Sequence, residues 1–258
     1  MIRFWVIFLF FSCAKIPLFK GDTPFSGQLK SFKAFENKDY LDHLASLGPV
    51  YLSSQSTETL LLPKAHTKYL NDIFKKIVSN NEQILTGYEK PNFHIIKSKR
   101  PFYFSLPNSQ FFLSLGLLKK YMKNEQLLNA VIASEVLRSV KGIYEKKIII
   151  PKGFLLTQQM LGIVKIPSSV KYNLNKWSFY VLKRADMDPF ALLNWIQIQN
   201  KNVLDFNPDQ GGMRDQTREE FLFKNFLVKE GFQDESINEE RIRPSKEFYR
   251  FLSFIRRH

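Results

Sequence analysis

The stretch Asn124–Tyr144 reads NEQLLNAVIASEVLRSVKGIY, and its pattern decides what the rest of the chain packs around. Asn124 is a favourable N-cap residue, Glu125 places a negative charge in the first turn, and no proline follows before Pro151. The stretch therefore predicts a helix of several turns. We expect it to be buried, because its apolar residues cover more than half of the circumference. These residues are Leu127, Leu128, Val131, Ile132, Val136, Leu137, Val140 and Ile143.

Three polar residues interrupt this apolar helix, namely Ser134, Glu135 and Arg138. Burying an ionised side chain is costly unless the charge is paired and hydrogen-bonded. An acidic and a basic residue on a buried helix therefore require an explanation, and the flanking sequence offers one.

Two flanking segments carry a resemblance to a known family. Phe104–Leu118 reads FSLPNSQFFLSLGLL, and Leu128–Arg138 reads LNAVIASEVLR. Together they resemble the HtpX-like zinc endopeptidases, peptidase family M48. That family has a strand ending in a Phe-Ala-Leu-Pro-Gly-like segment, then a Gly-Leu-Leu, then a helix bearing His-Glu-x-x-His. Its two histidines bind one zinc ion, and its glutamate activates the metal-bound water.

The resemblance implies a degenerate metal site. Ser134 and Arg138 stand at the two histidine positions, and Glu135 alone is retained. The family's third ligand is a Glu in a Glu-x-x-x-Asp motif ahead of an Asp-Pro turn. Aligning that turn with Asp188–Pro189 places Lys171 at the ligand and Asn175 at the Asp. The resemblance thus implies no zinc, no other cofactor, and a zincin-like fold that has lost its peptidase activity.

The substitutions also change the charge of the site. Arg138 and Lys171 bring two cations to the place of a divalent metal ion. A zinc ion would therefore lack its ligands and would also be repelled by these charges. Glu135 lies three residues before Arg138, within reach of a helical ion pair. We therefore hypothesise that Arg138, Glu135 and Lys171 form a structural ion network in the vacated site.

Other chemistry at this site is weighed against simpler explanations. A metal site built from histidines would have to assemble over long sequence distances, since no two of them are four residues apart. The four are His43, His66, His94 and His258. A serine–lysine hydrolase dyad of Ser134 and Lys171 is a further alternative, set against a packed serine and an ordinary surface lysine.

The first residues, Met1–Cys13, read MIRFWVIFLFFSC and are typical of a secretory signal. Arg3 precedes an apolar run too short to span a bilayer, and the segment ending at Cys13 is similar to a bacterial lipobox. We predict removal of residues 1–12 and lipidation of Cys13, the single cysteine. An ordinary cleaved signal and an uncleaved anchor are the alternatives. The chain is then an exported lipoprotein on a membrane, facing the periplasm or the cell exterior.

The remaining chain divides by pattern into three parts. Residues 13–60 are predicted to be a tether and wrap-around segment, with a short helix near Tyr40–Leu47. Residues 61–200 form the M48 peptidase-like domain, and 201–258 a helical C-terminal extension. The expected fold is α+β and helix-rich, with a small sheet packed on the central helix. The expected elements are helices at Pro63–Ser79, Ser168–Ala185, Phe190–Ile198, Thr217–Lys229 and Lys246–Arg256, strands at Asn92–Ile96, Phe102–Leu106 and Phe111–Leu115, and a loop at 201–216.

Function is expected from binding rather than from cleavage. In the family, a strand beside the metal helix holds the substrate backbone by β-augmentation, which here implies Phe102, Tyr103, Phe104, Ser105 and Leu106. The expected partners are envelope proteins or extended peptides. The net charge of +14 is spread over the whole chain, and export argues against nucleic acid. An ordinary solvated, lysine-rich surface and an attraction to anionic lipid or other envelope polyanions are the two alternatives.

Three functions therefore stand side by side. The first, which we favour, is an inactive pseudopeptidase that acts as a binding or scaffold protein in the bacterial envelope. The second is an active M48-type zinc endopeptidase with non-standard ligands. The third is a purely structural envelope lipoprotein.

Overall fold

The computed structural model describes residues 33–147, 155–210, 213–232 and 243–258. The chain divides into two units, Met1–Asp39 and Tyr40–His258. In the first unit the described residues are 33–39, which begin helix α2. The predicted signal at residues 1–12 and the predicted lipidation site at Cys13 lie outside the described residues. Within the described ranges, no helix has the length and apolarity needed to cross a bilayer.

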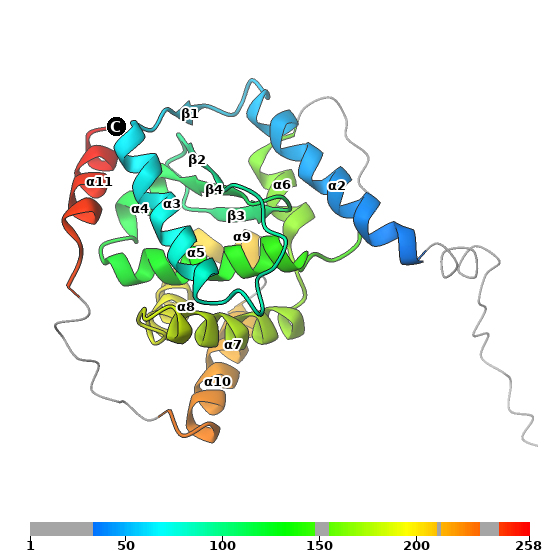
Figure 1. Cartoon of the computed structure of the whole chain (residues 1–258), viewed down its shortest axis with the longest axis vertical. Helices are drawn as coiled ribbons and strands as arrows, with labels where there is room; N and C mark the ends of the chain where they lie inside the picture. The colour runs from blue at the N-terminus through cyan, green and yellow to red at the C-terminus, as the bar shows by residue number, and fades with distance from the viewer. Residues whose placement is uncertain (1–32, 148–154, 211–212, 233–242) are drawn as a thin grey trace, which may run out of the picture. The chain divides into compact units, whose positions relative to one another are not determined.

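The described residues of the second unit form a helix-rich α+β fold with one small sheet (Figure 1). Its strands are β1 (Thr59–Leu60), β2 (Asn92–Ile96), β3 (Tyr103–Leu106) and β4 (Gln110–Ser114). Its helices are α2 (Lys33–Leu52, continuing from the first unit), α3 (Lys64–Ser79), α4 (Leu115–Lys120), α5 (Glu125–Lys141), α6 (Thr157–Val164), α7 (Ser168–Arg184), α8 (Ala191–Lys201), α9 (Val203–Gln210), α10 (Met213–Lys229) and α11 (Lys246–Arg257).

The sheet is mixed and has the strand order β1-β2-β4-β3. β1 and β2 are antiparallel, β2 and β4 are parallel, and β3 and β4 are antiparallel. The predicted strands at 92–96, 102–106 and 111–115 agree with β2, β3 and β4 to within one residue at each end. β3, which contains the predicted peptide-binding residues, is an edge strand.

Side chains alternate between the two faces of this sheet, as a pleated sheet requires. Ile95, Phe111 and Leu113 belong to the larger core, which includes α3 and α5. Phe104 and Phe112 lie on the other face, stacked with ring centroids 4.6 Å apart, in a second core that includes α2 and α6. The sheet is therefore covered on both faces.

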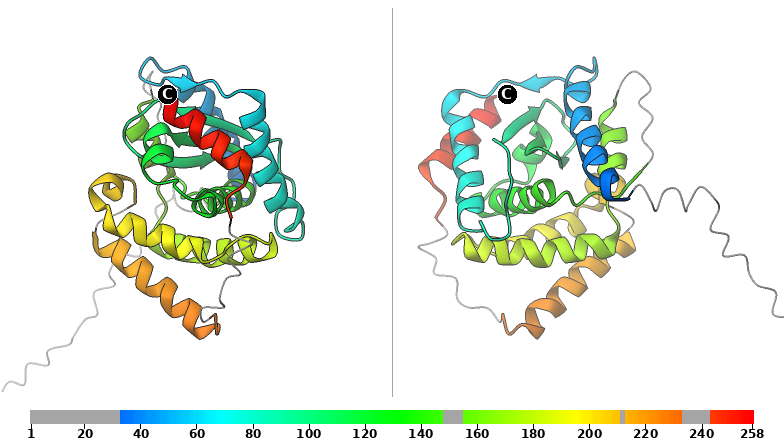
Figure 2. Two further views of the ribbon diagram at one scale, coloured as in Figure 1. Left: turned by 90° about the vertical axis from the view of Figure 1, so that its left-hand side faces the viewer. Right: turned by 45° about the vertical axis from the view of Figure 1, so that its right-hand side comes forward.

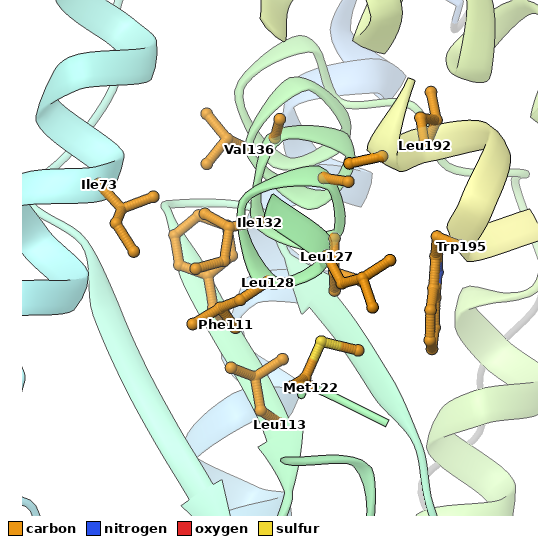
Figure 3. Close-up of a cluster of buried hydrophobic side chains, with 14 of the residues drawn as sticks. Ile73, Phe111, Leu113, Met122, Leu127, Leu128, Ile132, Val136, Leu192 and Trp195 are labelled. Atoms are coloured by element: carbon orange, nitrogen blue, oxygen red, sulfur yellow. The ribbon is translucent and has the colours of Figure 1, made fainter. Parts of the chain in front are cut away.

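α5 packs against α3, α7, α8 and β3, and its residues 125–139 are all buried. The side chain of Asn124 accepts a hydrogen bond from the Gln126 amide at 2.7 Å, so the predicted N-cap is confirmed. The helix ends at Lys141, earlier than Tyr144, because Gly142 adopts a left-handed conformation (φ 61°). Figure 3 shows α5 between Ile73 of α3 and Trp195 of α8.

Three sequence expectations were wrong. The segment 201–216, predicted to be a loop, contains α9 and the start of α10. Phe206 is buried against Tyr121 and Trp195, at centroid distances of 5.0 and 5.5 Å, so tertiary packing overrides the weak local helix signal. The spacing of three and four residues between Leu174, Trp177 and Val181 predicts Trp177 on the core stripe of α7, but its side chain is 54% exposed. Residues 33–52 form one helix, longer than the short helix expected near Tyr40–Leu47.

The last helix, α11, packs against α3 and α4 (Figure 2). Its N-cap, Ser245, donates its hydroxyl proton to Glu125 Oε1 at 2.7 Å, and the same oxygen accepts the Tyr69 hydroxyl at 2.7 Å. Glu125 thus joins α3, α5 and α11 through one buried carboxylate. Residues 201–258, predicted as an extension, belong to the same unit as the rest of the fold.

Candidate functional site

The five residues of the predicted degenerate site line one cavity. Ser134, Glu135 and Arg138 reach it from α5, and Lys171 and Asn175 reach it from α7. Residues of β3, α6, α8, α9 and α10 complete the lining. The cavity has a volume of about 70 Å³, enough for a few water molecules.

Lys171 forms its ion pair with a residue that the sequence interpretation missed. Its Nζ lies 2.7 Å from Oε2 of Glu219 in α10, and Asn175 Nδ2 donates to Oε1 of the same carboxylate at 2.6 Å. The Glu219 side chain is 6% exposed. One sequence signal was present, since Glu219 precedes the buried Phe223 by four residues and so lies on the apolar stripe of α10.

Glu135 and Arg138 form the second ion pair of the cavity. Arg138 Nη1 lies 3.8 Å from Glu135 Oε2, and the two side chains are 9% and 7% exposed. The guanidinium also lies over the Tyr144 ring, 5.0 Å from its centroid. Among the described residues, neither Arg138 Nη2 nor Glu135 Oε2 has a hydrogen-bond partner. The hypothesised cluster of Arg138, Glu135 and Lys171 is thus represented by two ion pairs that line one cavity, and the partner of Lys171 in its pair is Glu219.

The side chains of Ser134 and Lys171, the two members of the alternative hydrolase dyad, both bond to other groups. The Ser134 hydroxyl donates to the Ala130 carbonyl oxygen at 3.1 Å, an ordinary bond of a serine inside a helix. The Lys171 ammonium is paired with Glu219. Both groups thus have structural partners, in line with the simpler alternative of a packed serine and an ordinary lysine.

The lining of the cavity does not fit zinc. Zinc needs three or four His, Cys or carboxylate ligands with free lone pairs directed at one point. Within the described ranges, no three His, Cys, Asp or Glu side chains come close enough together to hold a metal ion. Each of the two cavity carboxylates, Glu135 and Glu219, is already paired with a cation.

No protein-family model matches the chain, and a search of curated proteins finds no match.

Tyr103 links the edge strand to the cavity. Its hydroxyl oxygen accepts hydrogen bonds from Trp195 Nε1 at 3.2 Å and Gln199 Nε2 at 3.0 Å. Burial raises the pKa of this phenol, and the carboxylates of Glu135 and Glu219 raise it further, so the hydroxyl stays protonated. Trp195 and Gln199, both of α8, were not predicted as site residues.

The outer edge of β3 is built for pairing but is covered. The Ser114 amide donates to Phe102 O at 3.1 Å, so the alternate residues Tyr103 and Ser105 direct their backbone groups away from β4. Helix α6 packs in the same core as Phe102 and Phe104. It also lines the cavity together with Tyr103, whose side chain points to the opposite face of the sheet. It therefore packs beside β3. The side chain of Ser105 is fully buried.

Proposed function

We propose that this protein is a catalytically inactive relative of the M48 zinc peptidases that binds extended segments of envelope proteins. One observation carries the proposal. The cations at two of the implied ligand positions, Arg138 and Lys171, are paired with the carboxylates Glu135 and Glu219 inside one cavity. A zinc ion would have to displace both pairs, and it would meet two positive charges there.

The arrangement of the elements supports the zincin-like relationship. The resemblance requires positions 134, 135 and 138 of one helix to meet positions 171 and 175 of another. In the structure these positions, on α5 and α7, line the same cavity. The antiparallel edge strand β3 beside α5 agrees with the same relationship.

Loss of the metal removes the chemistry but leaves the binding edge. Glu135 without a metal-bound water has no activated nucleophile to generate. The outward backbone groups at Ser105 of the β3 edge can still pair with an extended peptide as an added strand. Such a peptide must first displace α6, which makes the β3 edge a gated binding site. A lipid anchor at Cys13 would hold this edge near other envelope proteins.

Two measurements separate the proposal from its alternatives. The purified protein is analysed for zinc, and casein cleavage is assayed with and without a chelator. We expect substoichiometric zinc and no cleavage. One zinc ion per chain together with chelator-sensitive cleavage would instead establish an active peptidase.

Peptide binding is tested by crosslinking to an array of extended envelope-protein peptides. Ser105→Pro removes an amide on the outer edge of β3. Thr59→Pro is the matched change on the other edge strand, β1. The Lys97 amide donates to the Glu58 carbonyl oxygen, so the next residue, Thr59, directs its amide away from β2. We expect the first variant to lose crosslinking and the second to keep it, with circular dichroism verifying that both fold. Equal crosslinking by both variants would exclude the β3 edge, and no crosslinking by the natural chain would favour a purely structural lipoprotein.

A further inference from the structure

A second hollow is rich in basic residues, and it shares no lining residue with the cavity that holds the two ion pairs. It lies between the β2–β3 turn and α4 and has a volume of about 440 Å³. Its lining, here called the basic hollow, consists of Lys97, Ser98, Lys99, Leu115, Gly116, Lys119, Lys120 and His258. No acidic side chain belongs to this described lining. We propose that the basic hollow binds the phosphate group of a phosphate monoester, independently of the function proposed for the cavity.

The walls of the basic hollow are fixed by a close backbone contact. The Gly116 amide donates to the Ser98 carbonyl oxygen at 2.8 Å. A Cβ atom at Gly116 would lie 2.1 Å from the Lys99 carbonyl oxygen, so only glycine permits this approach. The turn that carries Lys99 and the helix that carries Lys119 are thereby held together across the hollow.

The charge of the basic hollow is only partly compensated. Lys97 is paired with Glu58 and Lys120 with Asp205, and these acids lie outside the lining. Lys99 and Lys119 have no ion pair within the described part of the chain. Lys99 and Lys119 therefore give the lining an uncompensated positive charge, which an anion that enters would offset.

The lysine ammonium groups and the volume of the basic hollow indicate the class of ligand. Lysines bind phosphate as point charges, and one phosphate group can accept hydrogen bonds from several ammonium groups at once. The volume falls within the range of small-molecule pockets, about 300–1,000 Å³. A phosphate with an organic substituent therefore suits it better than a bare anion. The monoester can be a free solute or the headgroup of phosphatidic acid.

The test measures binding of phenyl phosphate to the full chain by titration calorimetry. Lys99→Gln/Lys119→Gln removes the two uncompensated charges of the basic hollow. Lys75→Gln/Lys229→Gln, on exposed positions of α3 and α10, removes the same net charge elsewhere. We expect the first pair of substitutions to weaken binding at least about tenfold, because the loss of even one charged hydrogen bond has an effect of this size. The second pair should weaken binding less than about twofold.

A parallel arm identifies the source of the phosphate. Vesicles containing phosphatidic acid are compared with pure phosphatidylcholine vesicles, using the same variants. Loss of vesicle binding by the first pair alone assigns the hollow to a lipid headgroup, and an effect on phenyl phosphate alone assigns it to a solute. Equal weakening by both pairs, or no binding of either probe by the natural chain, would overturn the proposal. Neither result depends on whether the chain binds zinc or peptides.

Discussion

Lys171 of α7 and Glu219 of α10 form an ion pair of 2.7 Å in which the two side chains are 17% and 6% exposed. Removing the Glu219 carboxylate leaves the largely buried Lys171 ammonium group without this negative charge. We therefore expect Glu219→Ala to lower the free energy of unfolding by about 3 kcal/mol, measured by urea denaturation. Replacing both partners by apolar residues, as Lys171→Met/Glu219→Leu, should restore most of this loss.

A surface pair on the same helix provides the control for this experiment. Glu220 and Lys224 are 2.6 Å apart, with side chains 21% and 49% exposed. Because solvent screens the Lys224 ammonium group, Lys224→Ala should cost less than about 1 kcal/mol. Equal losses for Glu219→Ala and Lys224→Ala would show that burial does not set the strength of the Lys171 pair.

Breaking the Glu135–Arg138 pair should also lower the free energy of unfolding. Glu135→Ala leaves the Arg138 guanidinium, 9% exposed, with less compensation, and we expect a loss of about 2 kcal/mol in the free energy of unfolding. Glu135→Leu/Arg138→Met should recover stability by filling the space with apolar atoms. An unchanged or increased stability of Glu135→Ala would argue against a structural ion network.

The metal site should be recoverable if the peptidase relationship is right. Ser134→His, Arg138→His and Lys171→Glu together recreate the ligand set that the resemblance implies. We expect this triple variant to retain about one zinc ion per chain after gel filtration, and zinc should raise its melting temperature. The single variant Ser134→His, which keeps both cations, serves as the control. Failure of a folded triple variant to hold zinc would contradict the assigned register.

Helix α6 should limit access to the β3 edge. Leu161 and Val164 are buried, and both line the cavity. Leu161→Ser/Val164→Ser weakens their packing, so we expect several-fold more peptide crosslinking and a lower melting temperature. Gln158→Ser, at an exposed position of the same helix, should change neither. Crosslinking that stays constant when α6 is loosened would show that α6 does not gate the edge.

His94 should make the fold sensitive to mild acid. Burial lowers its pKa, and its ring stacks on Phe112 at 5.0 Å. Since the folded pKa lies below the unfolded value, the contribution of His94 is complete above about pH 6.5 and is lost as the pH falls through the folded pKa. His94→Phe keeps an aromatic ring at this position, so the free energy of unfolding should depend less on pH between pH 7.5 and 5. Parallel pH profiles for the variant and the natural chain would contradict this.

Local patterns predicted the parts of the fold whose stability is local. The N-cap at Asn124, the strand at 92–96 and the amphipathic helix α3 follow from capping, alternation and helical spacing, and the structure contains them. The same patterns failed where distant packing decides. Phe206 lies in a segment rich in turn-forming residues, yet its burial against Trp195 accompanies a helix there.

The candidate site shows the same division. A motif on one helix and a turn dipeptide predicted that positions 135 and 171 belong together, and they line one cavity. The charge partner of Lys171 was not predictable in this way, because Glu219 belongs to a later helix outside any recognised motif. Spacing along one element identifies neighbours on that element, whereas a buried charge takes its partner from whichever element packs across it.

The origin of Glu219 in a late helix has a consequence for biosynthesis. A ribosome completes α7 well before it reaches α10, so the nascent Lys171 emerges without the carboxylate that later neutralises it. Until then hydration favours keeping its ammonium group in water, which opposes docking of α7 on α5. Chaperones that bind apolar helices would meet an uncovered α5 face during this interval of translation.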